Sequence, residues 1–294
     1  MSEAPIGVFD SGMGGLTVLK ALLGRLPGED FVYLGDTARL PYGTKSPETV
    51  ARYALQAAEA LEAYRVKCLV IACNTASSVG LPIIRERIES VPVVGVIEPG
   101  ARAACEASSS GHIAVIATEG TVRGGAYQQA ILRLRPGARV TALPAPLFVS
   151  LAEEGLHTGS IAGAVARHYL RPIFGATDSA ESRPDTLVLG CTHFPMLAAS
   201  IRRAAGRGVR IVDSAATTAE TVVRGLTDAG LLRTGTTGSS SGARKSARKS
   251  VRKSSRTRGT VRFLATDGIE RFARIGGGFL GRAITRGEVE LIDL

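Results

Sequence analysis

The stretch LVIACNTASS, residues 69–78, decides the fold: an apolar run ends in a cysteine, and Asn, Thr and Ser follow at once. A second stretch, LVLGCTHFP at residues 187–195, has the same pattern. Short continuous apolar runs before small polar residues are typical of strands covered on both faces. A cysteine in such a place is often only a small core residue. Two cysteines in one context, Cys73 and Cys191, instead indicate a shared role.

Similar apolar runs recur along the chain and alternate with amphipathic segments. This alternation predicts an α/β fold with doubly wound, largely parallel sheets, in which ligands bind beyond the carboxyl ends of the strands. We expect strands at residues 6–9, 31–34, 68–72, 93–96, 113–117, 139–142, 186–189, 209–212, 261–265 and 289–292. We expect helices at residues 15–26, 47–64, 76–88, 99–108, 121–134, 161–174, 195–205 and 215–229.

Length and composition set the broad class of the protein. The chain of 294 residues is 45% hydrophobic and 21% charged, which is globular composition with room for about two domains. No apolar run approaches the roughly 20 residues that cross a bilayer. The N-terminus, MSEAPIGVFDSG, has no basic segment before its apolar run, so we expect no signal peptide, no membrane partner and a cytoplasmic location. The four cysteines form no CxxC pair, which argues against a disulfide framework, and no metal site is predicted.

The net charge of +10 is concentrated in one segment. From Ala243 to Arg258 the sequence ARKSARKSVRKSSRTR holds eight cations and no acid, so removing these eight charges leaves +2. We expect residues 234–260 to form a solvated, disordered insertion, because they offer no apolar face to bury. Nucleic-acid binding through this segment is the alternative, although its lack of aromatic side chains argues against base stacking.

The surroundings of the two cysteines predict a chemistry. Each follows a predicted strand and precedes a helical segment, where backbone N–H groups favour a thiolate. His193 lies two residues beyond Cys191, and Asp10 ends another strand that could bring it to Cys73. Two thiols across a cleft can remove a proton from one face of a carbon and return one to the other face, which inverts a stereocentre. The alternative is a pair of unrelated core cysteines.

Other chemistries fit the sequence less well. A single-nucleophile enzyme needs only one cysteine, and pyridoxal chemistry needs a Schiff-base lysine. The segment GMGG, residues 12–15, resembles a dinucleotide loop, but the spacing fails because Thr17 replaces the third glycine; it is a tight turn or a carboxylate site. No cofactor is predicted. Outside the insertion the lysines, none of them in a convincing cofactor loop, are Lys20, Lys45 and Lys67.

Seven motifs follow one another along the chain: GVFDSGMGGLTVL (7–19), YLGDTARLPYGTKS (33–46), IACNTASS (71–78), GVIEPG (95–100), GTVRGGAY (120–127), LGCTHFP (189–195) and VDSA (212–215). Together they resemble the glutamate racemases of the cofactor-independent aspartate/glutamate racemase superfamily. Each motif alone is moderate evidence, whereas seven in order are highly specific. The resemblance covers nearly the whole chain apart from the basic insertion.

The resemblance implies two α/β domains related by an approximate twofold axis, with the active site at their interface. Apportioned to this chain, the first domain comprises residues 1–97 and 209–294, and the second residues 98–208. The twofold relation would explain the two similar cysteine contexts. The resemblance also implies a homodimer and a reaction without a cofactor.

The resemblance further implies roles for individual residues. Cys73 and Cys191 would be the catalytic bases, one for each face of the α-carbon. Asp10 and His193 would tune or relay protons for their respective thiols, and Glu153 resembles an acidic position near the active site. Substrate contacts would come from Asp10, Ser11, Pro41, Tyr42, Gly43, Asn74, Thr75, Thr118, Thr121, Thr192 and His193.

The implied activity is the interconversion of L- and D-glutamate, which supplies D-glutamate for peptidoglycan. Aspartate racemase is the alternative within the superfamily, because the residues alone do not decide the length of the substrate side chain. The chain departs from the family at Gly124, where related sequences often carry Ser. This change would weaken one contact to the substrate or to the partner domain.

Overall fold

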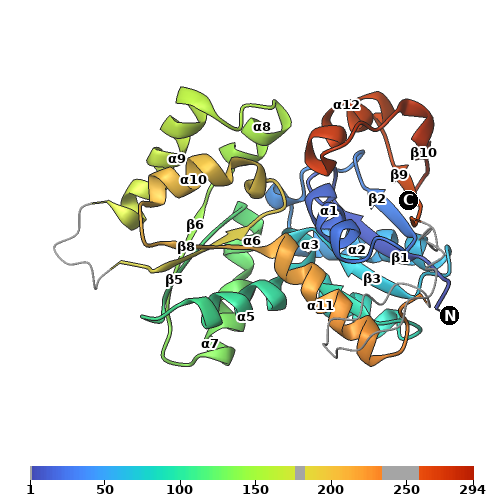
Figure 1. Ribbon diagram of the computed structural model, residues 1–294, viewed down its shortest axis with the longest axis horizontal. Coiled ribbons are helices and arrows are strands. Elements are labelled where there is room, and N and C mark those ends of the chain that lie inside the picture. The colour runs from blue at the N-terminus through green and yellow to red at the C-terminus, as the bar shows by residue number, and fades with distance from the viewer. Residues whose placement is uncertain (1, 176–182, 234–257) are drawn as a thin grey trace, which may run out of the picture.

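The computed structural model describes residues 2–175, 183–233 and 258–294. Within them, two parallel β-sheets are each packed between helices (Figure 1). The predicted basic segment lies outside these residues except for Arg258. The first sheet consists of β1 (Ile6–Asp10), β2 (Phe31–Gly35), β3 (Cys68–Ile71), β4 (Val93–Gly95), β9 (Val261–Ala265) and β10 (Val289–Leu291). The second consists of β5 (His112–Ala117), β6 (Arg139–Pro144), β7 (Thr186–Gly190) and β8 (Arg210–Asp213).

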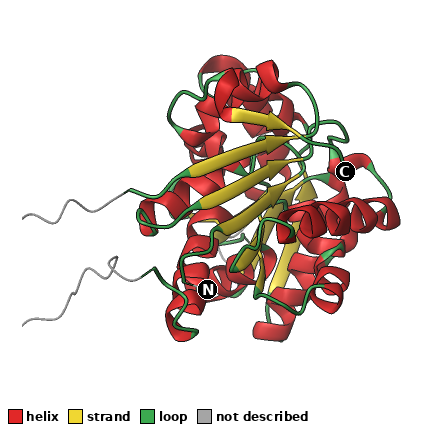
Figure 2. Ribbon diagram, turned by 90° about the vertical axis from the view of Figure 1, so that its right-hand side faces the viewer, coloured by secondary structure: helices red, strands yellow, loops and turns green. Residues whose placement is uncertain are grey.

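Strand order confirms the predicted doubly wound, two-sheet α/β architecture. The order is β10-β9-β2-β1-β3-β4 in the first sheet and β6-β5-β7-β8 in the second. Every neighbouring pair of strands is parallel, as the arrows in Figure 2 show. Both sheets therefore have all their carboxyl ends at one edge, and loops from that edge can form a binding site.

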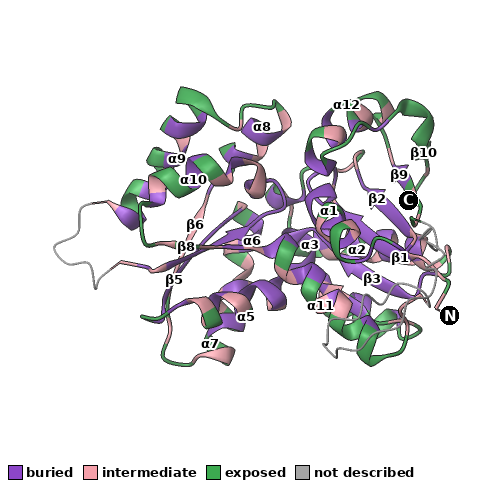
Figure 3. Ribbon diagram, in the orientation of Figure 1, coloured by how far each residue is buried: buried purple, intermediate pink, exposed green. Residues whose placement is uncertain are grey.

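Helices cover both faces of each sheet, and Figure 3 shows the central strands, such as β1, β3 and β5, buried between them. None of the helices in the described ranges has the length and apolarity needed to span a bilayer. The α-helices are α1 (Leu16–Arg25), α2 (Pro47–Glu62), α3 (Asn74–Val79), α4 (Leu81–Arg87), α5 (Ile97–Ala107), α6 (Glu119–Gly124), α7 (Ala126–Leu134), α8 (Leu147–Glu153), α9 (Gly159–Phe174), α10 (Ala198–Ala205), α11 (Ser214–Asp228) and α12 (Ile269–Leu280). Short 3₁₀ turns are η1 (Tyr42–Thr44), η3 (Phe194–Leu197) and η4 (Arg286–Glu288).

All the predicted strands are present, with ends within two residues of the expected ones. The helices differ more. The segment expected at 121–134 is interrupted at Gly125, whose φ of +66° ends α6 before α7 begins. The helices α8 and α12 were not predicted. In α12 three consecutive glycines argue against a helix, but Phe272, Ile275 and Phe279 recur at helical spacing and are buried, so tertiary packing overrides the propensity.

The last strand of the second sheet corrects one detail of the predicted domain division. The boundary expected after residue 208 assigns β8 to the first domain, yet β8 pairs with β7 over Thr186↔Arg210 to Leu189↔Asp213. Its backbone groups obtain their ladder hydrogen bonds there, and the chain returns to the first sheet through α11. The other extents of the two domains stay predictions.

A buried ion pair lies at the amino ends of the first sheet's strands, away from the carboxyl edge. Lys67, directly before β3, pairs with Glu29, two residues before β2 begins, and both side chains are fully buried. Lys67 Nζ also donates to the carbonyl of Ser2 at 2.6 Å, and Glu29 accepts from the backbone N–H of Arg233 at 2.8 Å. The pair therefore connects the N-terminal segment, through Ser2, to the segment that follows α11, through Arg233.

We expect Lys67→Met to lower the free energy of unfolding by about 3 kcal/mol, because it leaves the Glu29 carboxylate buried without its cation. The matched control is Arg262→Met, which breaks the exposed Arg262–Glu290 pair and should change stability by less than about 1 kcal/mol. Urea unfolding followed by circular dichroism measures both. Equal, small changes in the two variants would contradict a stabilising role for the buried pair.

Candidate active site

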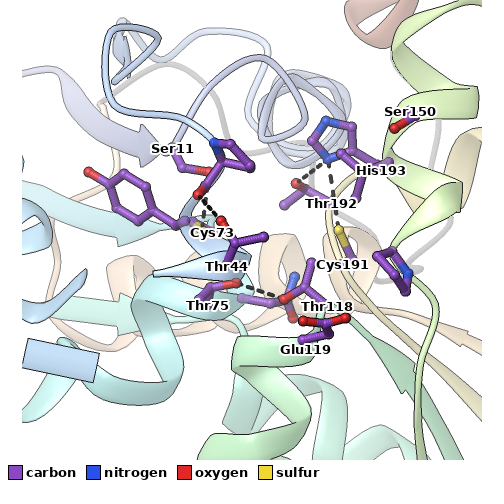
Figure 4. A pocket seen from close by; sticks show the side chains of 16 residues that line it. Ser11, Thr44, Cys73, Thr75, Thr118, Glu119, Ser150, Cys191, Thr192 and His193 are labelled. Atoms are coloured by element: carbon purple, nitrogen blue, oxygen red, sulfur yellow. Dashed lines mark hydrogen bonds between the residues drawn. The ribbon is translucent and has the colours of Figure 1, made fainter. Parts of the chain in front are cut away.

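The carboxyl ends of strands from both sheets meet around one cavity of about 230 Å³. Figure 4 shows Ser11 and Cys73 on one side of it and Cys191, Thr192 and His193 on the other. Of the residues predicted from sequence, those that line the cavity are Ser11, Pro41, Tyr42, Gly43, Cys73, Asn74, Thr75, Thr118, Cys191, Thr192 and His193.

Three predicted residues lie behind this lining and contact it: Asp10 through Thr192, Thr121 through Thr75 and Thr118, and Glu153 through His193. Sequence reasoning missed five lining residues. Thr44 and Glu119 directly follow predicted positions, and Thr44 also lies within one of the seven motifs. The other three belong to the unpredicted helix α8 and the residue before it, a segment in which only Glu153 was singled out from the sequence: Pro146, Val149 and Ser150.

Cys73 occupies the turn between β3 and α3. It caps the helix, with its Sγ accepting a hydrogen bond from the backbone N–H of Ala76 at 3.4 Å, and it lies 3.5 Å from Ser11 Oγ. As expected for a helix start, the backbone N–H of Ala76 favours a thiolate, but burial outweighs it. Burial, with a contribution from the Asp10 carboxylate, raises the pKa of Cys73 to about 12. The thiol of Cys73 is therefore a proton donor in this structure.

Cys191 follows β7 and has a different partner. His193 Nδ1 lies 3.8 Å from Cys191 Sγ, and His193 Nε2 lies 3.2 Å from Glu153 Oε1. Arg271 on α12 completes the chain by donating to Glu153 Oε2 at 2.6 Å. Burial disfavours an imidazolium, but the hydrogen bonds to Cys191 and Glu153 outweigh it and raise the pKa of His193 to about 10. A cationic His193 stabilises negative charge on the adjacent sulfur.

Glu153 is the anionic member of this chain. Burial alone would favour its neutral form, yet the hydrogen bonds from His193 and Arg271 hold the pKa of its carboxyl below the usual range. Arg271 comes from the C-terminal helix α12, which packs on the first sheet, whereas Glu153 ends α8 beside the second. The carboxylate is therefore fixed by a cation from across the interface.

Asp10 lies between the two cysteine environments. Its strand β1 is the neighbour of β3, which meets the condition for bringing Asp10 to Cys73. The side chain is fully buried and accepts hydrogen bonds from the Gly12 backbone at 3.0 Å and from Thr192 Oγ1 at 3.5 Å. Burial raises the pKa of Asp10, and the charge of His193 acts against that rise. Asp10 therefore interacts with Cys73 on one side of the site and with Thr192 and His193 on the other.

The glycine loop after β1 serves close packing between the two halves. A Cβ on Gly14 would lie 2.4 Å from the His193 ring and from Thr192 Oγ1, and a Cβ on Gly15 would lie 2.4 Å from the Asp10 side chain. Thr17 donates to the carbonyl of Thr192 at 2.9 Å. These contacts account for the glycines without a dinucleotide.

Threonines from both halves meet at the other end of the cavity. The hydroxyls of Thr75, Thr118 and Thr121 form a triangle with sides of 2.9, 3.0 and 3.1 Å. Gly43 approaches so closely that a Cβ there would lie 2.8 Å from Thr118. Gly124, where the family often has Ser, lies next to Ser78 of α3 rather than on the cavity lining, so it belongs to the contact between the two halves.

The arrangement suits proton transfer at a carbon. Two buried thiols lie on opposite sides of one cavity (Figure 4), one beside a carboxylate and the other beside an imidazole. The rest of the lining offers neutral hydroxyl and amide groups and the Glu119 carboxylate, and it contains no lysine or arginine. Within the described ranges, no three His, Cys, Asp or Glu side chains are grouped to hold a metal ion.

Comparisons with known proteins agree on one family. The family profile described as Asp/Glu/Hydantoin racemase matches residues 13–222. A glutamate racemase of Geobacter metallireducens is 44% identical over 289 residues, covering 98% of this chain and 96% of that protein. The structure of glutamate racemase from Francisella tularensis in complex with D-glutamate superposes with a TM-score of 0.84 at 33% identity, covering 100% of this chain and 98% of that one. The RacE1 isoform of Bacillus anthracis gives 0.86 at 33% identity, with coverage of 100% and 99%.

We expect the alkylation rate of Cys73 by iodoacetamide to keep rising up to and beyond pH 10 in the folded protein, because only the thiolate reacts and its pKa is raised to about 12. The urea-unfolded chain is the control, in which the rate should level off near pH ~9. Peptide mass mapping after timed pulses measures the rate at this one cysteine. A plateau near pH ~9 in the folded protein would contradict the effect of burial.

We expect Glu153→Gln to lower the pKa of His193 from about 10, because the neutral amide no longer stabilises the imidazolium against burial. The adjacent, exposed Glu154 provides the matched control, Glu154→Gln, which should leave the titration of His193 unchanged. NMR titration of the ¹⁵N-labelled imidazole follows both variants. An unchanged His193 titration in Glu153→Gln would show that Glu153 does not set its charge.

Proposed function

This chain belongs to the glutamate racemase family, and we propose that it interconverts L- and D-glutamate by moving the α-proton between Cys73 and Cys191. The observation that carries this mechanism is the pair of buried thiols on opposite sides of one cavity. Aspartate is not favoured as the substrate, because the relatives that cover nearly the whole chain are glutamate racemases. Nucleic-acid binding is not favoured either.

The two thiols have different neighbours, and we assign them different roles at the start of the reaction. With His193 charged beside it, Cys191 is the base that removes the α-proton from one face of the substrate, leaving a planar carbanion. The Cys73 thiol then donates its proton to the opposite face. Inversion leaves Cys191 as a thiol and Cys73 as a thiolate, which is the starting state for the reverse direction. Asp10 and His193 act on the charge of their respective sulfurs, and Glu153 keeps His193 cationic.

Neutral donors bind the substrate in this proposal. Glutamate carries two carboxylates and one ammonium. The cavity lining contains no lysine or arginine to pair with the carboxylates, and the cationic His193 is assigned to Cys191. We assign carboxylate binding to the hydroxyls of Ser11, Thr75 and Thr118 and to the amide of Asn74, and we expect the Glu119 carboxylate to attract the ammonium. Pro41, Tyr42 and Gly43 close the cavity, with Tyr42 held by a hydrogen bond to Asp36.

Hydrogen bonds from neutral groups hold the substrate carboxylates in place while the proton moves at the α-carbon. A substrate bound in the cavity also displaces water that would compete with the thiols for the carbanion. The homodimer, the cytoplasmic location and the supply of D-glutamate for peptidoglycan that the family resemblance implies are part of this proposal.

The test is racemisation of L- and D-glutamate in D₂O by the purified chain, followed by optical rotation and α-deuterium content. We expect loss of rotation with one α-deuterium in the product. Cys73→Ser and Cys191→Ser should each lower racemisation by at least about 100-fold. Each should retain α-deuterium exchange with only one enantiomer, and the two variants with opposite enantiomers.

The matched control is Cys105→Ser, which removes a thiol that does not line the cavity and should keep full activity. Normal racemisation by either active-site variant would rule out the two-thiol mechanism. An inactive wild-type chain with glutamate and an active one with aspartate would replace the proposed substrate.

A further inference from the structure

The side-chain amide of Asn74 has a hydrogen-bond partner for its oxygen but none for its nitrogen among the described residues. It begins α3, lines the cavity and is 3% exposed. Its Oδ1 accepts a hydrogen bond from the hydroxyl of Tyr127 at 2.8 Å. Its Nδ2 is buried and has no partner among the described residues. A buried donor without a partner is costly, so this N–H group is set up for an acceptor that the cavity would receive.

Tyr127 is held rigidly from the other side of the interface. It lies in α7, which packs on the second sheet, whereas Asn74 follows β3 of the first. Its side chain is fully buried. A Cβ on Gly100 would lie 3.1 Å from the Tyr127 hydroxyl, and a Cβ on Gly190 would lie 3.1 Å from its ring. Two glycines of the sequence motifs therefore leave the space that this ring occupies.

We propose that Tyr127 is a positioning residue: its hydroxyl fixes the Asn74 amide so that Nδ2 donates to a carboxylate oxygen of the substrate. An asparagine amide has nearly the same shape when it is turned by 180°, and only its hydrogen bonds decide which end faces a ligand. The Tyr127 hydroxyl occupies Oδ1 and leaves the donor end for the cavity. Turned the other way, Asn74 would present a carbonyl oxygen to a carboxylate, which repels it. The inference rests on the proposed function, because it takes glutamate as the ligand.

The hydrogen bond also links ligand binding to the placement of the two halves. Asn74 comes from the first sheet's side of the cavity and Tyr127 from the second, so the bond forms only when the halves are placed as in this structure. The Asn74 amide is thus oriented for the substrate only in the assembled site.

The test is Tyr127→Phe, which keeps the packed ring and removes only the hydroxyl. We expect KM for glutamate to rise about ten-fold with kcat changed less than about three-fold, since the lost interaction is made equally in the bound substrate and the transition state. Calorimetry with D-glutamate, in a background carrying Cys73→Ser and Cys191→Ser, should give the same fold-change in Kd. The matched control is Tyr169→Phe, which removes a hydroxyl bonded to the Leu147 backbone and should leave KM unchanged.

A double-mutant cycle separates positioning from packing. If Tyr127 acts through Asn74, then adding Tyr127→Phe to Asn74→Ala should leave KM and Kd as in Asn74→Ala alone. Multiplying effects, or an unchanged KM and Kd in Tyr127→Phe, would overturn the inference while leaving the racemase activity intact. An inactive wild-type chain would instead overturn the proposed function, and the fold-change in D-glutamate Kd would still decide the role of Tyr127.

Discussion

The close approach of the loop after β1 to the loop after β7 is the contact on which the rest of the site depends. Gly14 has no room for a side chain, because Thr192 and His193 occupy the position of its Cβ. Thr17 adds a hydrogen bond to the carbonyl of Thr192, and Asp10 accepts one from the Thr192 hydroxyl. With this contact in place, the carboxyl ends of two separate parallel sheets share one cavity. Neither sheet alone provides both thiols.

The interface also makes the two thiols unequal. Cys73 is buried beside an acid, Asp10, and burial disfavours its thiolate. Cys191 is buried beside His193, whose positive charge is maintained by Glu153 and, across the interface, by Arg271. The two cysteines thus have unlike partners in the same cavity, and the proposed reaction uses Cys73 as the proton donor and Cys191 as the proton acceptor. A reaction that moves one proton in and one proton out needs this asymmetry, and it needs the asymmetry to reverse with each turnover.

The buried ion pair that stabilises the fold and the residues that line the cavity lie at opposite edges of the first sheet. At the amino ends of its strands, Lys67 and Glu29 form a buried ion pair, and Lys67 also donates a hydrogen bond to the N-terminal segment. At the carboxyl ends, the buried Asn74 amide keeps a donor without a partner, and Asp10 remains uncompensated by a direct cation contact in the described residues. Incomplete pairing is unfavourable for folding, and here it is confined to the edge where a ligand can complete it.

The sequence by itself determined the strand and helix alternation, the parallel architecture and the two cysteine contexts, because these depend on local periodicity and on residues adjacent in the chain. Glycines and polar residues at strand ends also marked most of the cavity lining. Only the tertiary structure decided that β8 joins the second sheet, that α12 is a helix despite its glycines, and that Arg271 and Tyr127 hold Glu153 and Asn74. The Asn74–Tyr127 and Glu153–Arg271 pairs are 53 and 118 residues apart in sequence, respectively. In each pair, the two residues lie on elements that pack against different sheets. Their contact depends on how two packed layers meet, which no local pattern encodes.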